Sequence, residues 1–166
     1  MIEIRSEILK SAMLCKAKND VRYYLNNLYI DYDKIVATNG HICFKAPITG
    51  DEQRIINFQG KIPSTFEKCI IENDSSLFYD KKGNIVAKLG VETIDARYPD
   101  YNRLYSDKKG GVEEIGISGV YLETIGKISK LMTKHSGCRF QFQSSHDAIN
   151  ICIGDARIVL MPMSVN

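Results

Sequence analysis

The stretch Asp20-Val21-Arg22-Tyr23-Tyr24-Leu25-Asn26, followed along the chain by Val36-Ala37-Thr38-Asn39-Gly40-His41, decides the fold. Both stretches combine aromatic and β-branched residues in short runs, which favours strands. On its own, Asn39-Gly40 is typical of a β-turn, because both residues tolerate the backbone angles that a tight turn requires. We therefore expect a meander of short strands here, with a sharp turn before His41.

Two later stretches extend this pattern, namely Asp95-Ala96-Arg97-Tyr98-Pro99-Asp100-Tyr101 and Val159-Leu160-Met161-Pro162-Met163. Taken in order, the four stretches resemble segments of the bacterial DNA polymerase III beta subunit, the ring-shaped processivity clamp. The first two are similar to its middle domain, the third to its Asp-Gly-Arg-Phe-Pro-Asp-Tyr segment, and the last to its extreme C-terminus. The resemblance rests on four ordered segments rather than on one motif.

Composition limits what kind of protein this is. The 166 residues suffice for one domain, or one and a half small ones, without metal or disulfide staples. A net charge of +2 argues against a protein that binds nucleic acid over its whole surface, so any DNA contact must be local. No apolar run is long enough to span a membrane. No leader precedes Ile2 and no Cys-x-x-Cys pair occurs, so we expect a soluble cytoplasmic protein with reduced thiols at Cys15, Cys43, Cys69, Cys138 and Cys152.

Periodicity divides the chain into three units with the same order of elements: a strand, a helix and a meander of strands. In the first unit we expect a strand at residues 2–4 and a helix from an N-cap at Ser6 to about Ala17, with Ile8, Ala12 and Cys15 on its buried stripe. The strands expected to follow in this unit are 21–26, 28–32, 35–38 and 42–46.

The second and third units repeat that order. The second has an expected strand at 54–58, a helix from Pro63 to about Ile71, and strands at 77–80, 85–89 and 91–95. The third unit follows a polar link at 106–111; its expected elements are a strand at 114–117, a helix at 121–134, and strands at 139–143, 148–153 and 157–163.

The resemblance implies an α+β, DNA-clamp-like fold built from half-domain units, with strands outside and helices lining a pore. Residues 1–107 correspond to the clamp's middle domain, with two half-domain units. Residues 112–166 correspond to the second half of its last domain. The clamp's first domain and the first half of its last domain have no counterpart here.

The resemblance also implies a binding site. Clamps hold short apolar peptide motifs of DNA polymerases and repair proteins in a pocket between their middle and C-terminal domains. Leucine, valine and adaptable methionine side chains beside a few polar groups suit such a ligand. The corresponding residues are Leu25, Thr38, Gly40, His41, Pro99, Arg103, Leu104, His146, Ala148, Val159, Leu160, Met161, Pro162 and Met163.

Two features of the sequence depart from the clamp pattern. Ile42 stands where clamps usually have arginine, and the chain ends in Ser164-Val165-Asn166 where they commonly end in arginine-leucine. Each segment also has a plainer explanation by itself: Asn39-Gly40 is an ordinary turn, and Met161-Pro162-Met163 is ordinary core packing at a chain end. Their combination in clamp order favours the peptide-binding pocket.

A DNA-facing surface is a separate hypothesis. Lys127, Lys130 and Lys134 share one face of the expected third helix, which suits sequence-independent contacts with phosphates. An ordinary solvated helix face explains the same pattern equally well. By resemblance, the loop around Arg22 corresponds to a clamp loop that touches DNA, and Tyr23 and Tyr24 lie beside it.

The alternative from a different class is a small thiol enzyme. His41 and Cys43 would share one face of a strand, an arrangement in which imidazole can activate a thiol. No third catalytic group accompanies them, and the sequence shows neither metal-ligand spacing nor a phosphate-binding glycine loop. We therefore expect no enzymatic activity, no metal and no cofactor.

Two roles follow from one peptide pocket. Several copies could assemble around DNA as a miniature sliding clamp, and three helices per chain would make four copies match the twelve helices of the family's ring. Alternatively, the protein acts as a decoy or adaptor that occupies the peptide motifs of replication and repair proteins. Because the surfaces that close the family's ring are absent, we expect an assembly smaller than a tetramer.

Overall fold

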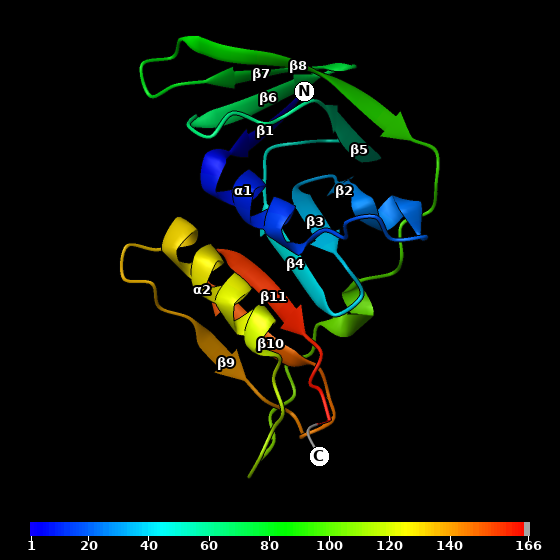
Figure 1. Ribbon diagram of the computed structural model, residues 1–166, viewed down its shortest axis with the longest axis vertical. Coiled ribbons are helices and arrows are strands. Elements are labelled where there is room, and N and C mark those ends of the chain that lie inside the picture. The colour runs from blue at the N-terminus through cyan, green and yellow to red at the C-terminus, as the bar shows by residue number, and fades with distance from the viewer. Residues whose placement is uncertain (165–166) are drawn as a thin grey trace.

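The computed structural model describes residues 1–164, and within them eleven strands form one antiparallel sheet (Figure 1). Their order across the sheet is β1-β6-β7-β8-β5-β2-β3-β4-β11-β10-β9. The strands are β1 (Ile2–Arg5), β2 (Leu28–Asp31), β3 (Lys34–Thr38), β4 (Ile42–Pro47), β5 (Gln53–Gln59), β6 (Lys68–Glu72), β7 (Ser75–Tyr79), β8 (Ile85–Ile94), β9 (Arg139–Gln141), β10 (Ile149–Ile153) and β11 (Ala156–Leu160).

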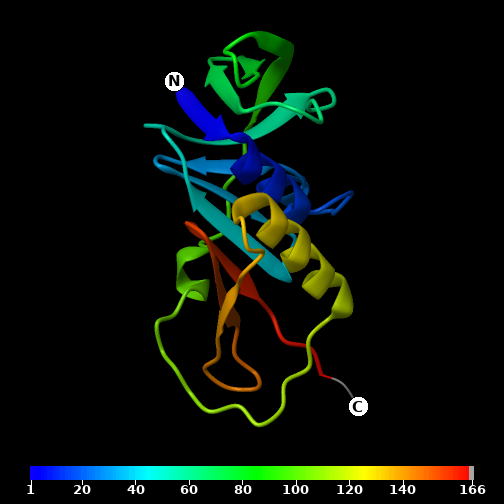
Figure 2. The same ribbon diagram turned by 90° about the vertical axis from the view of Figure 1, so that its left-hand side faces the viewer.

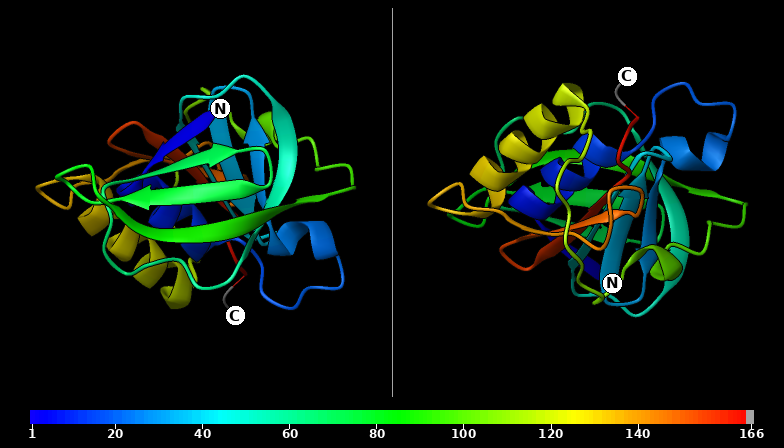
Figure 3. Two further views of the ribbon diagram at one scale, coloured as in Figure 1. Left: turned by 90° about the horizontal axis from the view of Figure 1, so that it is seen from above. Right: turned by 90° about the horizontal axis from the view of Figure 1, so that it is seen from below.

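Two α-helices, α1 (Ser6–Cys15) and α2 (Gly119–Met132), lie side by side and pack against this sheet (Figures 1 and 3). On α1 the stripe of Ile8, Ala12 and Cys15 is fully buried, as the sequence predicted. On α2 the residues Ile125 and Ile128 face the core. Ser6 is the first residue of α1 rather than its N-cap; Arg5 holds that position. The outward faces of both helices are left to solvent.

The main core fills the space between the helices and the bent sheet. Ile4 from β1, Leu9 from α1, Phe44 from β4 and Phe78 from β7 are all fully buried there. Burying one such side chain stabilises a protein by roughly 1.5–3 kcal/mol, so this layer supplies much of the driving force for folding. The expectation of an α+β clamp-like architecture is confirmed.

The second unit differs from its predicted form because it has no helix. Residues 63–71 were expected to be helical, but Lys68–Glu72 form β6. Cys69 and Ile71 point into the core at alternate positions, opposite Ile4 and Ile2 of β1. Apolar residues at alternate positions of β6 therefore pair with apolar residues of β1. This cross-strand pairing outweighs the tendency of Pro63 to start a helix. Only the short connection 60–67 remains between β5 and β6.

Smaller differences occur at three places. Residues 23–26 form a 3-10 helix rather than a strand, because the side chain of Asn26 bonds both the N–H and the C=O of Asp20 and closes a loop. The strands expected at 85–89 and 91–95 are one strand, β8. The expected strand 114–117 is an extended segment outside the sheet, where Gly116 O accepts a hydrogen bond from Met163 N at 2.9 Å.

The first and third units join edge to edge through β4 and β11. Val159 lies opposite Cys43, and Leu160 opposite Ile42, in an antiparallel register. The link between the second and third units crosses this seam: the Tyr105 hydroxyl donates to Cys43 O at 3.2 Å and approaches Arg157 O at 3.4 Å. Figure 2 shows the long loop that then leads from residue 105 to α2. The two predicted domains, 1–107 and 112–166, therefore share one sheet.

Neither α-helix of the described chain is both long and apolar enough to cross a membrane.

Candidate peptide-binding site and basic face

The seam between β4 and β11 brings the predicted peptide-binding residues of the first and third units together. Beyond the last strand pair, Met161 N donates to His41 O at 2.9 Å. The turn at Asn39-Gly40 therefore lies directly beside the C-terminal segment, although more than a hundred residues separate them in the sequence. Pairing of two strands, rather than a loop contact, fixes their relative position.

The turn before His41 is held by its own side chains. Asn39 Oδ1 accepts hydrogen bonds from His41 N at 2.9 Å and Ile42 N at 3.1 Å, while Thr38 Oγ1 donates to Ile42 O at 2.7 Å. Gly40 has φ +93°, where a side chain would be strained, and the Arg22 guanidinium lies 3.2 Å from where its Cβ would stand. The conformation of the turn therefore depends on the side chains of Thr38 and Asn39 and on a glycine at position 40.

Several predicted pocket walls are interior in this structure, which corrects the expectation that they are open. Leu25 and Val159 are 2% exposed, Leu160 is fully buried and Thr38 is nearly so. Leu25 and Val159 belong to a second apolar cluster closed by Tyr98 and Tyr101, with Leu104 and Ala148 at its margin. The stacking of Tyr98 on Tyr29, with ring centroids 4.6 Å apart, covers this cluster. These side chains are therefore not accessible from solvent.

The remaining predicted residues, which we call the rim, are accessible to solvent. Gly40, His41, Pro99, Arg103, His146, Met161 and Met163 are exposed, and Pro162 is half-buried. His41 stacks against the ring of Tyr121 with centroids 6.0 Å apart. Asn39 Nδ2 donates to the Tyr121 hydroxyl at 3.2 Å, so the first turn of α2 is tied to the turn of the first unit. Sequence reasoning did not identify Tyr121, since only the fold brings it here.

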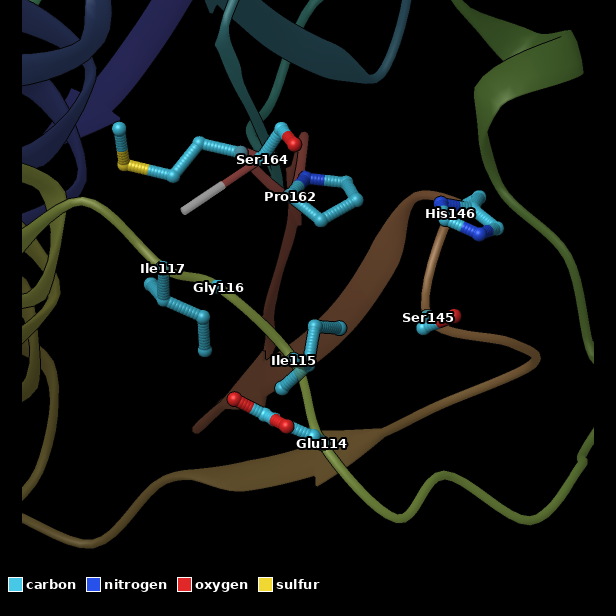
Figure 4. A pocket seen from close by; sticks show the side chains of 9 residues that line it. Glu114, Ile115, Gly116, Ile117, Ser145, His146, Pro162 and Ser164 are labelled. Atoms are coloured by element: carbon cyan, nitrogen blue, oxygen red, sulfur yellow. The ribbon is translucent and has the colours of Figure 1, made fainter. Parts of the chain in front are cut away.

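An open cavity of about 630 Å³ adjoins this rim (Figure 4). His146, Pro162 and Met163 line it, as predicted, together with residues that were not predicted: Glu114, Ile115, Gly116, Ile117, Ser145 and Ser164. The alternation of Ile115 and Ile117 was a signal for these walls, but it was interpreted as a strand of the sheet. Apolar side chains with one carboxylate and one imidazole give a cavity that can hold an apolar group beside a polar one. Val165 and Asn166, part of the departure at the chain end, lie outside the described residues.

The thiol-enzyme alternative is contradicted by the environment of Cys43. Its side chain is buried, and this burial raises the pKa of the thiol, which disfavours the reactive thiolate. Its sulfur lies 3.7 Å from the Tyr105 hydroxyl, while His41 precedes β4 and stacks on Tyr121. No group of three or more candidate metal ligands occurs within residues 1–164.

Of the three lysines predicted to share one face of the third helix, two lie on α2 and one lies just beyond its end. Lys127, Lys130 and Lys134 are all exposed, although Lys134 follows the end of the helix. Lys127 Nζ is paired with Glu123 at 2.7 Å, so its charge is partly neutralised. Figure 3 shows α2 and α1 together on one side of the sheet. The arrangement can attract phosphates, but it carries a modest charge.

Arg22, the predicted phosphate contact, is exposed but held by Asp20. Arg22 Nε and Nη2 donate to the two carboxylate oxygens of Asp20 at 3.0 and 2.8 Å. These hydrogen bonds lower the pKa of Asp20 to about 2. Tyr23 is half-exposed and its hydroxyl approaches Asp95 O at 3.5 Å, whereas Tyr24 is partly buried against the second cluster. Of this group, Arg22 and Tyr23 face solvent.

Comparison with known proteins gives one consistent result. No family model and no curated protein matches the sequence. Among solved structures, the chain is similar to DNA polymerase sliding clamps from Pseudomonas aeruginosa (TM-score 0.62, 14% identity, 98% of this chain and 66% of that one) and Bacillus subtilis (0.62, 12%, 99% and 64%). It is also similar to the Caulobacter crescentus pol III beta (0.64, 14%, 99% and 66%). Each match spans less than two thirds of the clamp chain, and nearly all of this chain. The chain therefore has the fold of the bacterial DNA polymerase III beta sliding clamps.

Proposed function

We propose that this protein is a clamp-like component of DNA replication or repair that binds short apolar clamp-interaction peptides of partner proteins. The observation that carries the proposal is the seam between β4 and β11. It brings residues of the four clamp-like stretches, which are dispersed along the chain, into one apolar cluster, and the C-terminal stretch also lines the open cavity. At the end of this seam Met161 and Met163, which are 41% and 48% exposed, present apolar side chains to solvent.

The chemistry of the rim suits such a peptide. Exposed methionine side chains adapt to apolar groups of different shape. Ile115, Ile117 and Pro162 offer apolar walls in the adjoining cavity, and His146 can donate to a peptide carbonyl. One of the similar structures, the clamp of Pseudomonas aeruginosa with TM-score 0.63, was solved bound to griselimycin. That clamp therefore accommodates a ligand on this fold.

The described helices support a decoy or adaptor more than a closed ring. The argument for four copies assumed three α-helices per chain, and the chain has two α-helices within residues 1–164. The outermost strands of the sheet are β1, from the first unit, and β9, from the third unit. In a closed ring, these edges would have to pair between neighbouring copies. Both are partly covered: Glu3 of β1 exchanges backbone hydrogen bonds with Thr49, and just after β9 the backbone of Gly110 donates to Phe142 O. Covered edges pair poorly with another copy.

Two measurements test this function. A fluorescein-labelled clamp-interaction peptide should bind the full chain at micromolar concentration, and unlabelled griselimycin serves as a competitor. Light scattering should give a mass below that of a tetramer, unchanged by the peptide. The absence of peptide binding at these concentrations would sink the proposal. A stable tetramer that leaves circular DNA only after linearisation would replace the decoy with a sliding clamp.

A further inference from the structure

An apolar groove lies on the helix side of the molecule and shares no residue with the cavity beside the rim. It has a volume of about 420 Å³ and is bounded by α1, by the connection between β5 and β6, and by the end of α2. Its apolar lining is supplied by Leu9, Met13, Leu14, Ile62, Pro63 and Leu131. Leu14 and Leu131 are 39% and 37% exposed, so two neighbouring helices each add an apolar side chain to one exposed patch.

The groove lies beside the connection at which the second unit has no α-helix. In the first and third units, a helix precedes the meander of strands and covers the sheet. In the second unit, residues 60–67 make the same connection without one. Phe66 from this connection is buried edge-on against Phe78, with centroids 5.1 Å apart, and fills part of the space. Of the α1 side chains that line the groove, Leu9 is buried, Met13 is half-buried and Leu14 is left exposed.

The charges around the groove have one sign. Lys10 and Lys61 are its only charged lining residues, and no carboxylate lines it. Lys10 is held in place, since its Nζ lies 5.1 Å from the centre of the Phe66 ring. On α2 the exposed Lys130 directly precedes Leu131. An occupant of this groove would therefore meet an apolar floor flanked by cations.

We propose that this groove binds an amphipathic helix of a partner protein, with leucine-like residues on its inner face and acidic residues on its flanks. The groove adjoins α1 at the connection that lacks a helix, and helices recognise such grooves through apolar residues spaced i, i+3, i+4 and i+7. Glutamate or aspartate on the flanks would face Lys10 and Lys61. The outward face of α2, with Lys127 and Lys130, carries the same sign as the groove, so a second copy is disfavoured as the occupant.

The probe for this site is a fluorescein-labelled helical peptide of about 15 residues, long enough for a few turns. Its inner face carries leucines at i, i+3, i+4 and i+7, and its flanks carry glutamates. A matched peptide has the same leucines and lysines in place of the glutamates. Fluorescence anisotropy with the full chain should show binding of the acidic peptide and at least about tenfold weaker binding of the basic one, because like charges then face the groove.

Matched protein variants locate the binding. Leu131→Lys and Leu122→Lys both replace an exposed leucine of α2, but only Leu131 lines the groove. Leu131→Lys should weaken binding of the acidic peptide about tenfold or more, since a buried interface leucine is lost, whereas Leu122→Lys should leave it unchanged. Lys61→Glu should shift the preference toward the basic peptide. Circular dichroism verifies that each variant is folded.

Three outcomes would overturn the inference. The first is equal binding of both peptides, or no binding of either at ~1 mM, which would leave the groove without affinity for a helix. The second is an equal loss in Leu131→Lys and Leu122→Lys, which would place the peptide elsewhere. The third is a dimer in sedimentation equilibrium that Leu131→Lys dissociates, which would make a second copy the occupant.

Discussion

The seam between the first and third units contains two regions built from the same clamp-like stretches, and they have opposite relations to solvent. Leu25 and Val159 lie inside a sealed cluster at 2% exposure, whereas Met161 and Met163 stand at 41% and 48% beside an open cavity. Val159 and Leu160 point to opposite faces of β11 and into different cores. The comparison teaches that one short stretch, residues 159–163, both packs in the core and reaches the exposed surface.

The largest effect is expected inside the sealed cluster. Leu25→Ala should lower the free energy of unfolding by about 2–5 kcal/mol, because it removes buried apolar atoms and leaves a cavity. A charged residue at this position should unfold the protein, so it is unsuitable as a test of peptide binding. Urea denaturation measures the change. A loss under about 0.5 kcal/mol, as at exposed sites, would show that the cluster is open rather than sealed.

The open region should behave in the reverse way. Met161→Glu should leave the unfolding free energy within about 0.5 kcal/mol of the wild type while weakening binding of the clamp-interaction peptide about tenfold or more. Ile85→Glu is the matched control, because Ile85 is also exposed but lies on β8, outside the rim. Equal peptide affinity in the two variants would place the binding surface away from Met161.

A smaller effect is expected on the basic face, which lies on the helix side. If this face meets phosphates, Lys130→Glu should weaken duplex binding for every sequence and reduce the slope of log affinity against log salt by about one or more. Lys88→Glu, an exposed lysine on β8, should change neither. Wild-type affinity that does not respond to salt would show that these lysines are only solvated surface.

The smallest effect concerns the ion pair at the loop of the first unit. Asp20→Asn keeps an oxygen for Arg22 N but removes the charge that pairs with the guanidinium, so DNA binding should become slightly stronger. Because the folded-state pKa of Asp20 lies near 2, below its usual value of 3.8, the stabilisation is present above pH 4 and lost as pH falls toward 2. The variant should lose that dependence in an acid titration monitored by circular dichroism. Unchanged DNA affinity would exclude Arg22 as a phosphate contact.

Much of the fold was predictable because it depends on neighbouring residues. The turn at Asn39-Gly40 is formed by the Asn39 side chain and the positive φ of Gly40, so the sequence of these two residues predicts it. The buried stripe of α1 follows from helical periodicity at Ile8, Ala12 and Cys15. The candidate site was predictable in part: His146, Pro162 and Met163 line the cavity, while Ile115 and Ile117 were assigned to a strand.

What failed depends on residues far apart in the sequence. The segment 63–71 has a helix-like start at Pro63, but Cys69 and Ile71 find apolar partners on β1, and pairing of these strands decides the outcome. The residues 21–26 look like a strand until Asn26 closes the loop onto Asp20. Secondary-structure propensity describes a residue in isolation. It therefore takes no account of the pairing of β1 with β6 or of the hydrogen bonds between Asn26 and Asp20.

The sequence by itself therefore determined the turn at Asn39-Gly40, the strand meanders, the two helices that form and the resemblance to clamps, because these depend on local chemistry and order. Only the tertiary structure decided that the second unit forgoes its helix and leaves a groove beside α1. It also decided that Leu25 is sealed while Met161 is exposed. The physical reason is that burial is a property of the assembled sheet: Tyr98 and Tyr101 cover one face of the seam and leave its edge open.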